Sequence, residues 1–331
     1  MSSSNVIEAH ALTKKFGDFT AVNGIDLEVK KGELFGLLGP NGAGKSTTMY
    51  MLSTILPPTS GTASVSGFDT VKQSVEVRKS IGMVFQDSSL DTHLSGYDNL
   101  DIHGRLYGMA KAEREAKIKE VLELVELVDW AGKLTKTYSG GMRRRLEIAR
   151  GLMHTPAVLF LDEPTLGLDP QTRRHIWDYL LKLKSQGVSM VLTTHYLEEA
   201  DSLCDRIAIV DHGVIKALGT PEELKRAIGE NAVYLSTKEK KKLTDVLNAN
   251  GFSATEAESL VMVKVKDGAS EIPKILKLTE KEGIGIESVE LRKPSLEDVF
   301  IQLTGRKIRD EAGTNVMGKM MAKAWGMRGK Q

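Results

Sequence analysis

Two kinds of apolar pattern alternate along the chain from about residue 5 to residue 220. Short runs that are apolar throughout, or that alternate with period two, predict β-strands, and they stand between segments with helical spacing. The predicted strands cover residues 6–11, 24–29, 34–38, 157–161, 189–193 and 205–210. Apolar strands between helices indicate a parallel sheet that helices cover on both faces, so we expect an α/β fold.

The segment of about residues 87–150 interrupts this alternation. Its middle, residues 111–128, is amphipathic, because apolar residues recur there at helical spacing: Ile118, Val121, Leu122 and Val125. We therefore expect a helical subdomain inserted into an α/β domain that spans residues 5–228.

Residues 231–303 have a different order of predicted strands and helices. Strands are predicted at residues 233–236, 260–266 and 286–291, and helices at residues 239–250 and 271–282. A final helix is expected to begin at Ser295, where Asp298 completes a capping box. The order of these elements resembles a small ferredoxin-like α+β module.

The tail, residues 304–331, is basic and rich in methionine. Seven basic side chains stand there against two acidic ones, Asp310 and Glu311. Two interpretations remain open. The tail is either solvated, or it forms a basic amphipathic segment that touches an anionic membrane surface or a partner.

Composition narrows the function. The 331-residue chain carries 45 lysines and arginines against 44 aspartates and glutamates, so no nucleic-acid partner is expected. The single cysteine, Cys204, excludes an intrachain disulfide and fits a reducing compartment. No apolar run approaches the roughly 18–20 residues that cross a bilayer, so we expect a chain that does not itself span a membrane.

A glycine-rich loop follows the strand predicted at residues 34–38. It fits the pattern G-x-x-x-x-G-K-[ST] with the residues Gly39, Pro40, Asn41, Gly42, Ala43, Gly44, Lys45, Ser46 and Thr47. In such a loop, backbone N–H groups turn inward around a phosphate, and the next helix N-terminus adds positive partial charge. Lys45 would reach the β- and γ-phosphates of ATP, and the Ser46 hydroxyl would ligate Mg²⁺.

Two acids, Asp162 and Glu163, end the apolar strand predicted at residues 157–161. A buried strand that ends in adjacent carboxylates needs a compensating charge, which Mg²⁺ supplies. We expect Asp162 to hold the ion, directly or through water, and Glu163 to polarise the attacking water as general base. The alternative is a pair of solvated loop acids.

A second anion site is predicted where Ser139, Gly140 and Gly141 precede a strongly helical run at residues 143–152. The loop at residues 39–47 already occupies one side of the triphosphate. The second site therefore lacks a ligand in its own chain, unless it serves the ATP of another copy.

This combination resembles the nucleotide-binding subunit of ABC transporters over roughly residues 5–220. Residues 138–142 resemble the signature motif of that family. The resemblance implies that Gln86 senses Mg²⁺ and contacts a membrane subunit, and that Asp169 lies in a loop crossing the dimer interface. It also implies that His195 contacts the γ-phosphate and that Phe16 stacks on adenine.

Two positions depart from the family pattern. Phe16 replaces the usual Tyr; it can stack but cannot donate a hydrogen bond, and Phe19 is a rival for the role. Met142 replaces the usual Gln. The phosphate contacts expected of Ser139 and Gly141 should survive that change, because they use the hydroxyl and the backbone.

Two segments, residues 138–150 and 293–300, narrow the resemblance to daunorubicin-resistance-type exporters. In the first segment, Arg143, Arg144 and Arg145 have an equally good interpretation as a solvated helix face.

The resemblance implies the ATP-hydrolysing motor of an ABC exporter, with multidrug or antibiotic export as one case. Two copies would close head-to-tail around two Mg-ATP and drive a separate integral membrane permease from the cytoplasmic face. A ribosome-associated ABC ATPase usually fuses two cassettes, and only one phosphate loop occurs here. A DNA-repair ATPase needs long coiled-coil insertions, and no heptad run occurs between the two phosphate-binding motifs.

Overall fold

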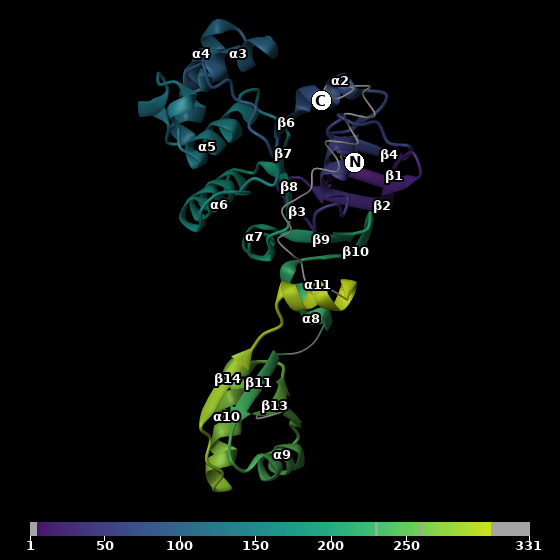
Figure 1. The fold of residues 1–331 in the computed structure, drawn as a ribbon, viewed down its shortest axis with the longest axis vertical. Coiled ribbons are helices and arrows are strands. Elements are labelled where there is room, and N and C mark those ends of the chain that lie inside the picture. Colours follow the sequence, from purple (N-terminus) through teal and green to yellow (C-terminus); the bar gives the residue numbers. More distant parts are fainter. Residues whose placement is uncertain (1–4, 229–230, 258–259, 306–331) are drawn as a thin grey trace, which may run out of the picture. The chain divides into compact units, whose positions relative to one another are not determined.

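The computed structural model describes residues 5–228, 231–257 and 260–305. They form two compact units, one that ends at Pro221 and one that begins at Glu222 (Figure 1). From residue 306 on, the predicted basic tail lies outside the described residues. Within the described part, no helix is both long enough and apolar enough to cross a membrane.

A six-stranded sheet forms the centre of the first unit. Its strands lie in the order β10 (Val214–Gly219), β9 (Arg206–Asp211), β3 (Leu34–Leu38), β8 (Ser189–Thr194), β7 (Val158–Asp162) and β6 (Ile81–Val84). All neighbouring strands from β9 to β6 pair in parallel, whereas β10 runs antiparallel to β9. β3 and β7 are buried along their whole length, which explains their apolar sequence.

The register of this sheet brings distant segments together. Leu38 lies opposite Thr194 on β8, and Asp162 lies opposite Thr193. Because parallel strands end at the same side of a sheet, the glycine loop, the two acids and His195 all emerge there.

The predicted strands at residues 6–11 and 24–29 do not belong to the parallel sheet, and that expectation was wrong. They lie in a separate antiparallel sheet of order β2 (Phe19–Lys30), β1 (Asn5–Phe16), β4 (Ser60–Val65) and β5 (Phe68–Asp69). Buried and exposed positions alternate along much of β2, since one face packs on the core and the other meets water.

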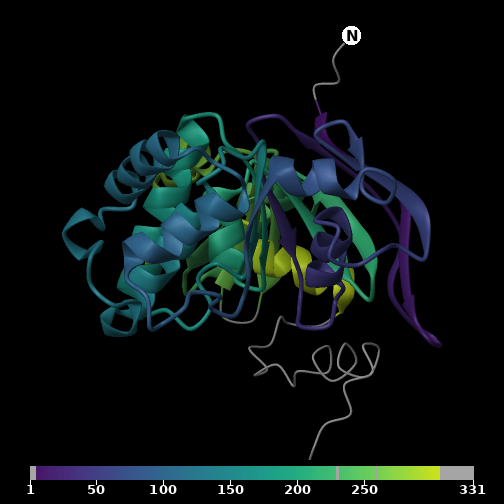
Figure 2. The same cartoon turned by 90° about the horizontal axis from the view of Figure 1, so that it is seen from above.

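The expected helical region contains α3 (Gly96–Leu106), α4 (Lys111–Leu124) and α5 (Gly140–Gly151), with short 3₁₀ turns at Val128–Trp130 and Thr135–Thr137. Figures 1 and 2 show these helices on one side of the six-stranded sheet and the antiparallel sheet on the other. The remaining helices of this unit are α1 (Lys45–Leu52), α2 (Ser74–Ser80), α6 (Pro170–Ser185) and α7 (Leu197–Leu203).

The second unit has the predicted ferredoxin-like order of elements: β11 (Asn231–Ser236), α9 (Lys240–Ala249), β12 (Ser253–Ala257), β13 (Leu260–Val265), α10 (Gly268–Lys281) and β14 (Ser288–Arg292). Its strands pair antiparallel in the order β12-β13-β11-β14. β12 was not predicted. α11 (Leu296–Thr304) begins at the capping box of Ser295 and Asp298, and α8 (Pro221–Ile228) belongs almost wholly to this unit.

Candidate functional site

The glycine loop between β3 and α1 is held by close backbone packing. A Cβ atom on Gly39 would lie 2.2 Å from the Val210 carbonyl oxygen, so no side chain fits there. Gly44 has φ +104°, and a Cβ would lie 2.5 Å from the Ala21 oxygen. Both glycines are therefore required by the shape of the loop, which leaves Asn41 and Gly42 exposed at its tip.

Lys45 lies folded back under this loop and is only 4% exposed. Its Nζ donates hydrogen bonds to the carbonyl oxygens of Gly39, at 2.7 Å, and Pro40, at 3.0 Å. Burial lowers the pKa of Lys45, while the charges of Glu163 and Asp162 oppose that shift. The ammonium thus stands at the base of the loop, where it can meet a phosphate.

Asp162, at the end of β7, is fully buried and accepts three hydroxyl hydrogen bonds. Oδ1 accepts from Ser46 at 2.9 Å and from Thr193 at 2.5 Å, and Oδ2 accepts from Tyr50 at 2.9 Å. Sequence reasoning missed Thr193 and Tyr50, although Tyr50 follows Ser46 by four residues on α1 and so shares its helix face.

The surroundings of Asp162 and Ser46 fit a magnesium ion better than a transition metal. Among the described residues, no cluster of three or more His, Cys, Asp or Glu side chains is arranged to hold a metal. Mg²⁺ does not need such a cluster, because it takes one or two carboxylates together with phosphate oxygens and water. Asp162 and the Ser46 hydroxyl, 2.9 Å apart, are a donor set of that kind.

Gln86 follows β6 and is exposed. Its predecessor, Phe85, is fixed through its carbonyl oxygen by Arg144. Its successor, Asp87, is near Tyr50: burial raises the pKa of Tyr50, and the charges of Asp162 and Asp87 raise it further. Arg144 also donates to the Asp162 carbonyl oxygen at 2.9 Å, so the start of the Gln86 loop lies beside the end of β7.

Glu163 is a buried carboxylate on strained backbone. Its φ is +45°, a left-handed conformation that costs a non-glycine residue about 1–3 kcal/mol. Its N–H donates to the backbone oxygen of Thr193 at 3.2 Å and to Oγ1 of Thr193 at 3.0 Å. These bonds hold the turn that carries the side chain away from the strand.

Two side chains, those of His195 and Lys45, meet at the carboxylate of Glu163, which is 8% exposed. His195 Nδ1 lies 3.2 Å from Oε1, and Lys45 Nζ lies 3.7 Å from the same oxygen. Burial raises the pKa of Glu163, but the His195 hydrogen bond and the Lys45 charge outweigh burial and leave it below its usual range. The carboxylate is therefore ionised at neutral pH.

A second group of the expected site residues lies at the starts of α5 and α6. Ser139 is exposed at the N-cap of α5, where Oγ accepts from the Met142 N–H at 3.2 Å. Asp169 caps α6 by accepting from the Thr172 N–H at 3.0 Å. A Cβ on Gly141 would lie 2.4 Å from Thr172 Cγ2, so the two helix starts pack closely.

The aromatic candidates lie at the tip of the β1–β2 hairpin, where Phe16 and Phe19 pair across the strands. Phe19 is 49% exposed, whereas Phe16 is half-buried and packs partly against the core. Lys14 Nζ lies 5.3 Å from the centre of the Phe16 ring. Both rings thus remain candidates for the stacking role.

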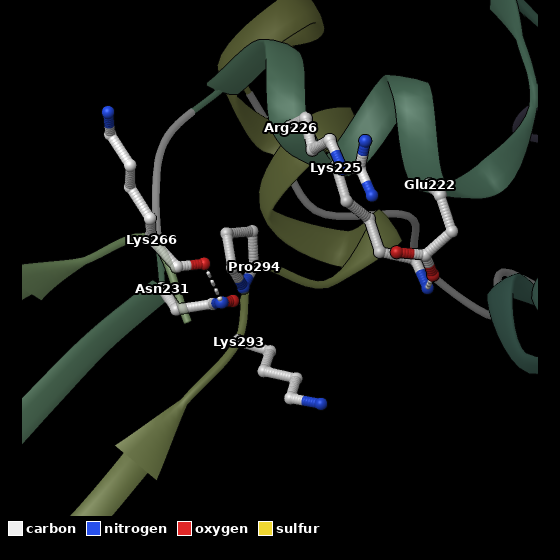
Figure 3. Close-up of a pocket in the computed structure, with 7 residues that line it drawn as sticks. All are labelled: Glu222, Lys225, Arg226, Asn231, Lys266, Lys293 and Pro294. Atoms are coloured by element: carbon white, nitrogen blue, oxygen red, sulfur yellow. Dashed lines mark hydrogen bonds and ion pairs between the residues drawn. The ribbon is translucent and has the colours of Figure 1, made fainter. Parts of the chain in front are cut away.

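A cavity of about 490 Å³ in the second unit has a different character (Figure 3). Glu222 pairs with Lys225 at 3.0 Å, and Asn231 donates to the Lys266 carbonyl oxygen at 3.1 Å. The side chains of Lys266 and Lys293 point away from each other. These groups do not converge as a catalytic set does.

Comparison with known proteins identifies the family. Residues 22–166 match the ABC transporter family, and residues 219–304 match the family described as ATP-binding protein DrrA1-3-like, C-terminal domain. The daunorubicin resistance ATP-binding protein DrrA3 of Streptomyces coeruleorubidus is 40% identical over 94% of this chain and 100% of its own length. The chain belongs to the ABC transporter ATP-binding proteins.

Other relatives of this ABC ATPase agree over most of the chain. The doxorubicin resistance protein DrrA of Mycobacterium tuberculosis is 40% identical over 87% of this chain and 89% of its own. The linearmycin resistance protein LnrL of Bacillus subtilis is 37% identical over 92% of this chain and 100% of its own.

Solved structures support the same conclusion. CbiO1 of Clostridium perfringens, part of the ABC transporter complex cbiONQ, has a TM-score of 0.63 and 29% identity, over 68% of this chain and 94% of its own. The dimeric ATP-binding cassette MJ0796, bound to ADP and Pi, has a TM-score of 0.58 and 28% identity, over 65% and 98%. The predicted P-loop ATPase fold, and ATP hydrolysis coupled to transport, are thereby confirmed for this ABC ATPase.

Proposed function

We propose that this ABC ATPase drives the export of drug-like or antibiotic molecules and that two copies close head-to-tail around two Mg-ATP. The proposal rests on one observation: Lys45 and His195 both contact the carboxylate of Glu163, which follows Asp162 in the sequence. The resistance functions in the names of the relatives support drugs or antibiotics as the transported class.

Each side chain of this group has a distinct task. Lys45 neutralises the β- and γ-phosphate oxygens, and His195 holds the γ-phosphate while its Nδ1–H orients Glu163. Glu163 takes the proton of the attacking water as general base. Ser46, Asp162 and Gln86 would hold Mg²⁺, which when bound offsets the charge of the phosphates.

The partner copy supplies the other half of each site. Ser139 is exposed at the start of α5, where the helix dipole favours an anion, and Gly141 lies buried two residues further in. Asp169 caps the neighbouring helix and lies on the same face. Closure around ATP would exclude water and fix the geometry of attack.

A groove of about 850 Å³ in the first unit is the proposed docking site for an integral membrane permease. It lies among α2, the end of α3 and α4, and its lining includes Val75, Leu106 and Tyr107. Leu106 is 79% exposed and Val75 49%, so two large apolar side chains of the groove are open to solvent and available to a partner. Docking there would hold the chain at the cytoplasmic face of the membrane.

The second unit is proposed to brace the dimer or to tune ATP hydrolysis. It has its own apolar core, with Val233, Leu243 and Ile275 fully buried, so it can hold its shape without the first unit. Removing residues 222–331 should weaken dimerisation measured by sedimentation while ATP binding persists. Unchanged dimerisation together with an unchanged turnover rate would contradict this role.

Glu163→Gln tests the proposed chemistry. The substitution keeps the shape but removes the base, so ATP binding should persist while turnover falls by about 10²–10⁴-fold. A long-lived dimer should then appear in gel filtration with Mg-ATP. Glu198→Gln, the same change at an exposed acid on α7, is the control and should leave turnover unchanged. Near-normal turnover in Glu163→Gln would sink the assignment.

A further inference from the structure

Arg144 on α5 joins the signature helix to the backbone of the catalytic acids. Nε donates to the Pro164 carbonyl oxygen at 2.7 Å, and Nη2 donates to the carbonyl oxygens of Asp162, at 2.9 Å, and Glu163, at 3.1 Å. One guanidinium thus holds three consecutive carbonyl groups. Arg144 is only 7% exposed, so its interpretation as part of a solvated helix face was wrong.

The remaining donors of Arg144 reach two further groups. Nη1 donates to the Phe85 carbonyl oxygen at 2.5 Å and to Glu147 Oε2 at 2.9 Å. All five N–H groups of the guanidinium therefore have partners. Glu147 balances the buried charge, and Phe85 directly precedes Gln86, so the same side chain also fixes the start of the Gln86 loop.

The backbone that Arg144 holds is the strained one. Glu163 has φ +45°, and such a conformation persists only where its surroundings over-determine it. The direction in which the Glu163 side chain leaves the chain depends on that turn. Any tilt of α5 would move the guanidinium and, with it, the carbonyl groups that fix this direction.

We propose that Arg144 is a positioning residue that couples the two halves of the composite site within one chain. Ser139, at the start of α5, contacts the nucleotide of the partner copy, and Arg144, five residues later, sets Glu163 and the Gln86 loop for the chain's own nucleotide. Engagement of one ATP thereby readies the base at the other. This inference rests on the proposed head-to-tail dimer.

Arg144→Lys in the full chain separates positioning from charge. Lysine keeps the ion pair with Glu147 but has three donors in place of a planar fork, so it cannot hold all four carbonyl groups. We expect kcat to fall by at least about tenfold, KM for ATP to stay within about threefold, and the Hill coefficient to drop toward one. Arg145→Lys is the matched control, because Arg145 binds the Val125 carbonyl oxygen inside the helical region.

A double variant tests whether Arg144 acts through Glu163. In single-turnover measurements on the Glu163→Gln chain, adding Arg144→Lys should lower the rate by less than about twofold, because the base is already absent. If Arg144→Lys fails to bind a fluorescent ATP analogue, Arg144→Gln, a shorter and neutral side chain with two donors, replaces it in both measurements.

Three outcomes would overturn the coupling. The first is a normal kcat in Arg144→Lys, and the second is a fall in kcat no greater than that in Arg145→Lys. The third is a double variant whose single-turnover rate falls by the product of the two single-variant factors. Failure of the proposed function itself would look different. In that case Glu163→Gln alone would retain turnover, whatever residue 144 is.

Discussion

At the scale of single residues, the proposed mechanism depends on a carboxylate, that of Glu163, which stays charged although it is buried. Burial alone would raise the pKa of Glu163, but the hydrogen bond from His195 and the charge of Lys45 lower it by more. The ionised form is the one a general base needs. The same two contacts therefore contribute to stability and to reactivity.

This balance predicts a pH dependence of stability. Because the folded-state pKa of Glu163 is depressed, its contribution is fully present above the unfolded pKa, about 4.3, and is lost as pH falls through the lower folded value. The stability difference between the wild type and Glu163→Gln, from urea unfolding at several pH values between neutral and about 3, should shrink below about pH 4.3. A difference that grows toward acid pH would contradict this assignment.

The sequence alone predicted those site residues that belong to a motif of fixed spacing or end an apolar strand. The loop pattern indicated Lys45 and Ser46, and the end of an apolar strand indicated Asp162 and Glu163. It could not single out Arg144, because three arginines in a row look alike until packing decides which one faces inward. The hydroxyl of Thr193 was hidden for a similar reason, since its partner depends on strand register.

At the scale of elements, prediction succeeded where a run was continuously apolar. β3 covers the residues predicted for it, because a buried parallel strand is apolar on both faces. β12 was missed, since the segment Ser-Ala-Thr-Glu-Ala has no apolar pattern and forms an edge strand through its pairing with β13. β1 and β2 were assigned to the wrong sheet, because the local sequence of a strand does not determine which strand it pairs with.

The groove beside α3 gives a prediction at this scale. Leu106→Glu would replace an apolar side chain of the groove by a carboxylate that permease binding must desolvate, so affinity should fall by about tenfold or more, which is about 1.4 kcal/mol. Co-purification of the membrane permease and export should both fall, while ATP turnover of the isolated chain stays within about twofold. Val128→Glu is the control, because Val128 is also an exposed apolar residue but does not line the groove. Normal permease binding by Leu106→Glu would refute the docking site.

At the scale of the whole molecule, the central claim is that a working site needs two chains. Lys45, Asp162, Glu163 and His195 lie together in one chain, whereas Ser139 is presented at the exposed start of α5. The length and composition of the chain carry no trace of this arrangement. We infer it from the helix start at Ser139, which is proposed to bind the phosphate of the partner's ATP.

Mixing two inactive variants tests this claim most directly. Ser139→Asp keeps the N-cap of α5 but sets a negative charge against the phosphate of the partner's ATP. Alone, this variant should be inactive, and so should Glu163→Gln. The control Ser139→Thr keeps both the cap and the hydroxyl and should stay active. In a mixed dimer both defects fall in one site and the other site is intact. An equal mixture should therefore regain ATPase activity above that of either variant alone, with about a quarter of the wild-type rate as the upper limit. Half of the dimers are mixed, and each mixed dimer has one intact site. Coupling through Arg144 lowers the rate below that limit, because the base of the intact site belongs to the chain with Ser139→Asp. A mixture that stays at the level of the two separate variants would contradict the composite site.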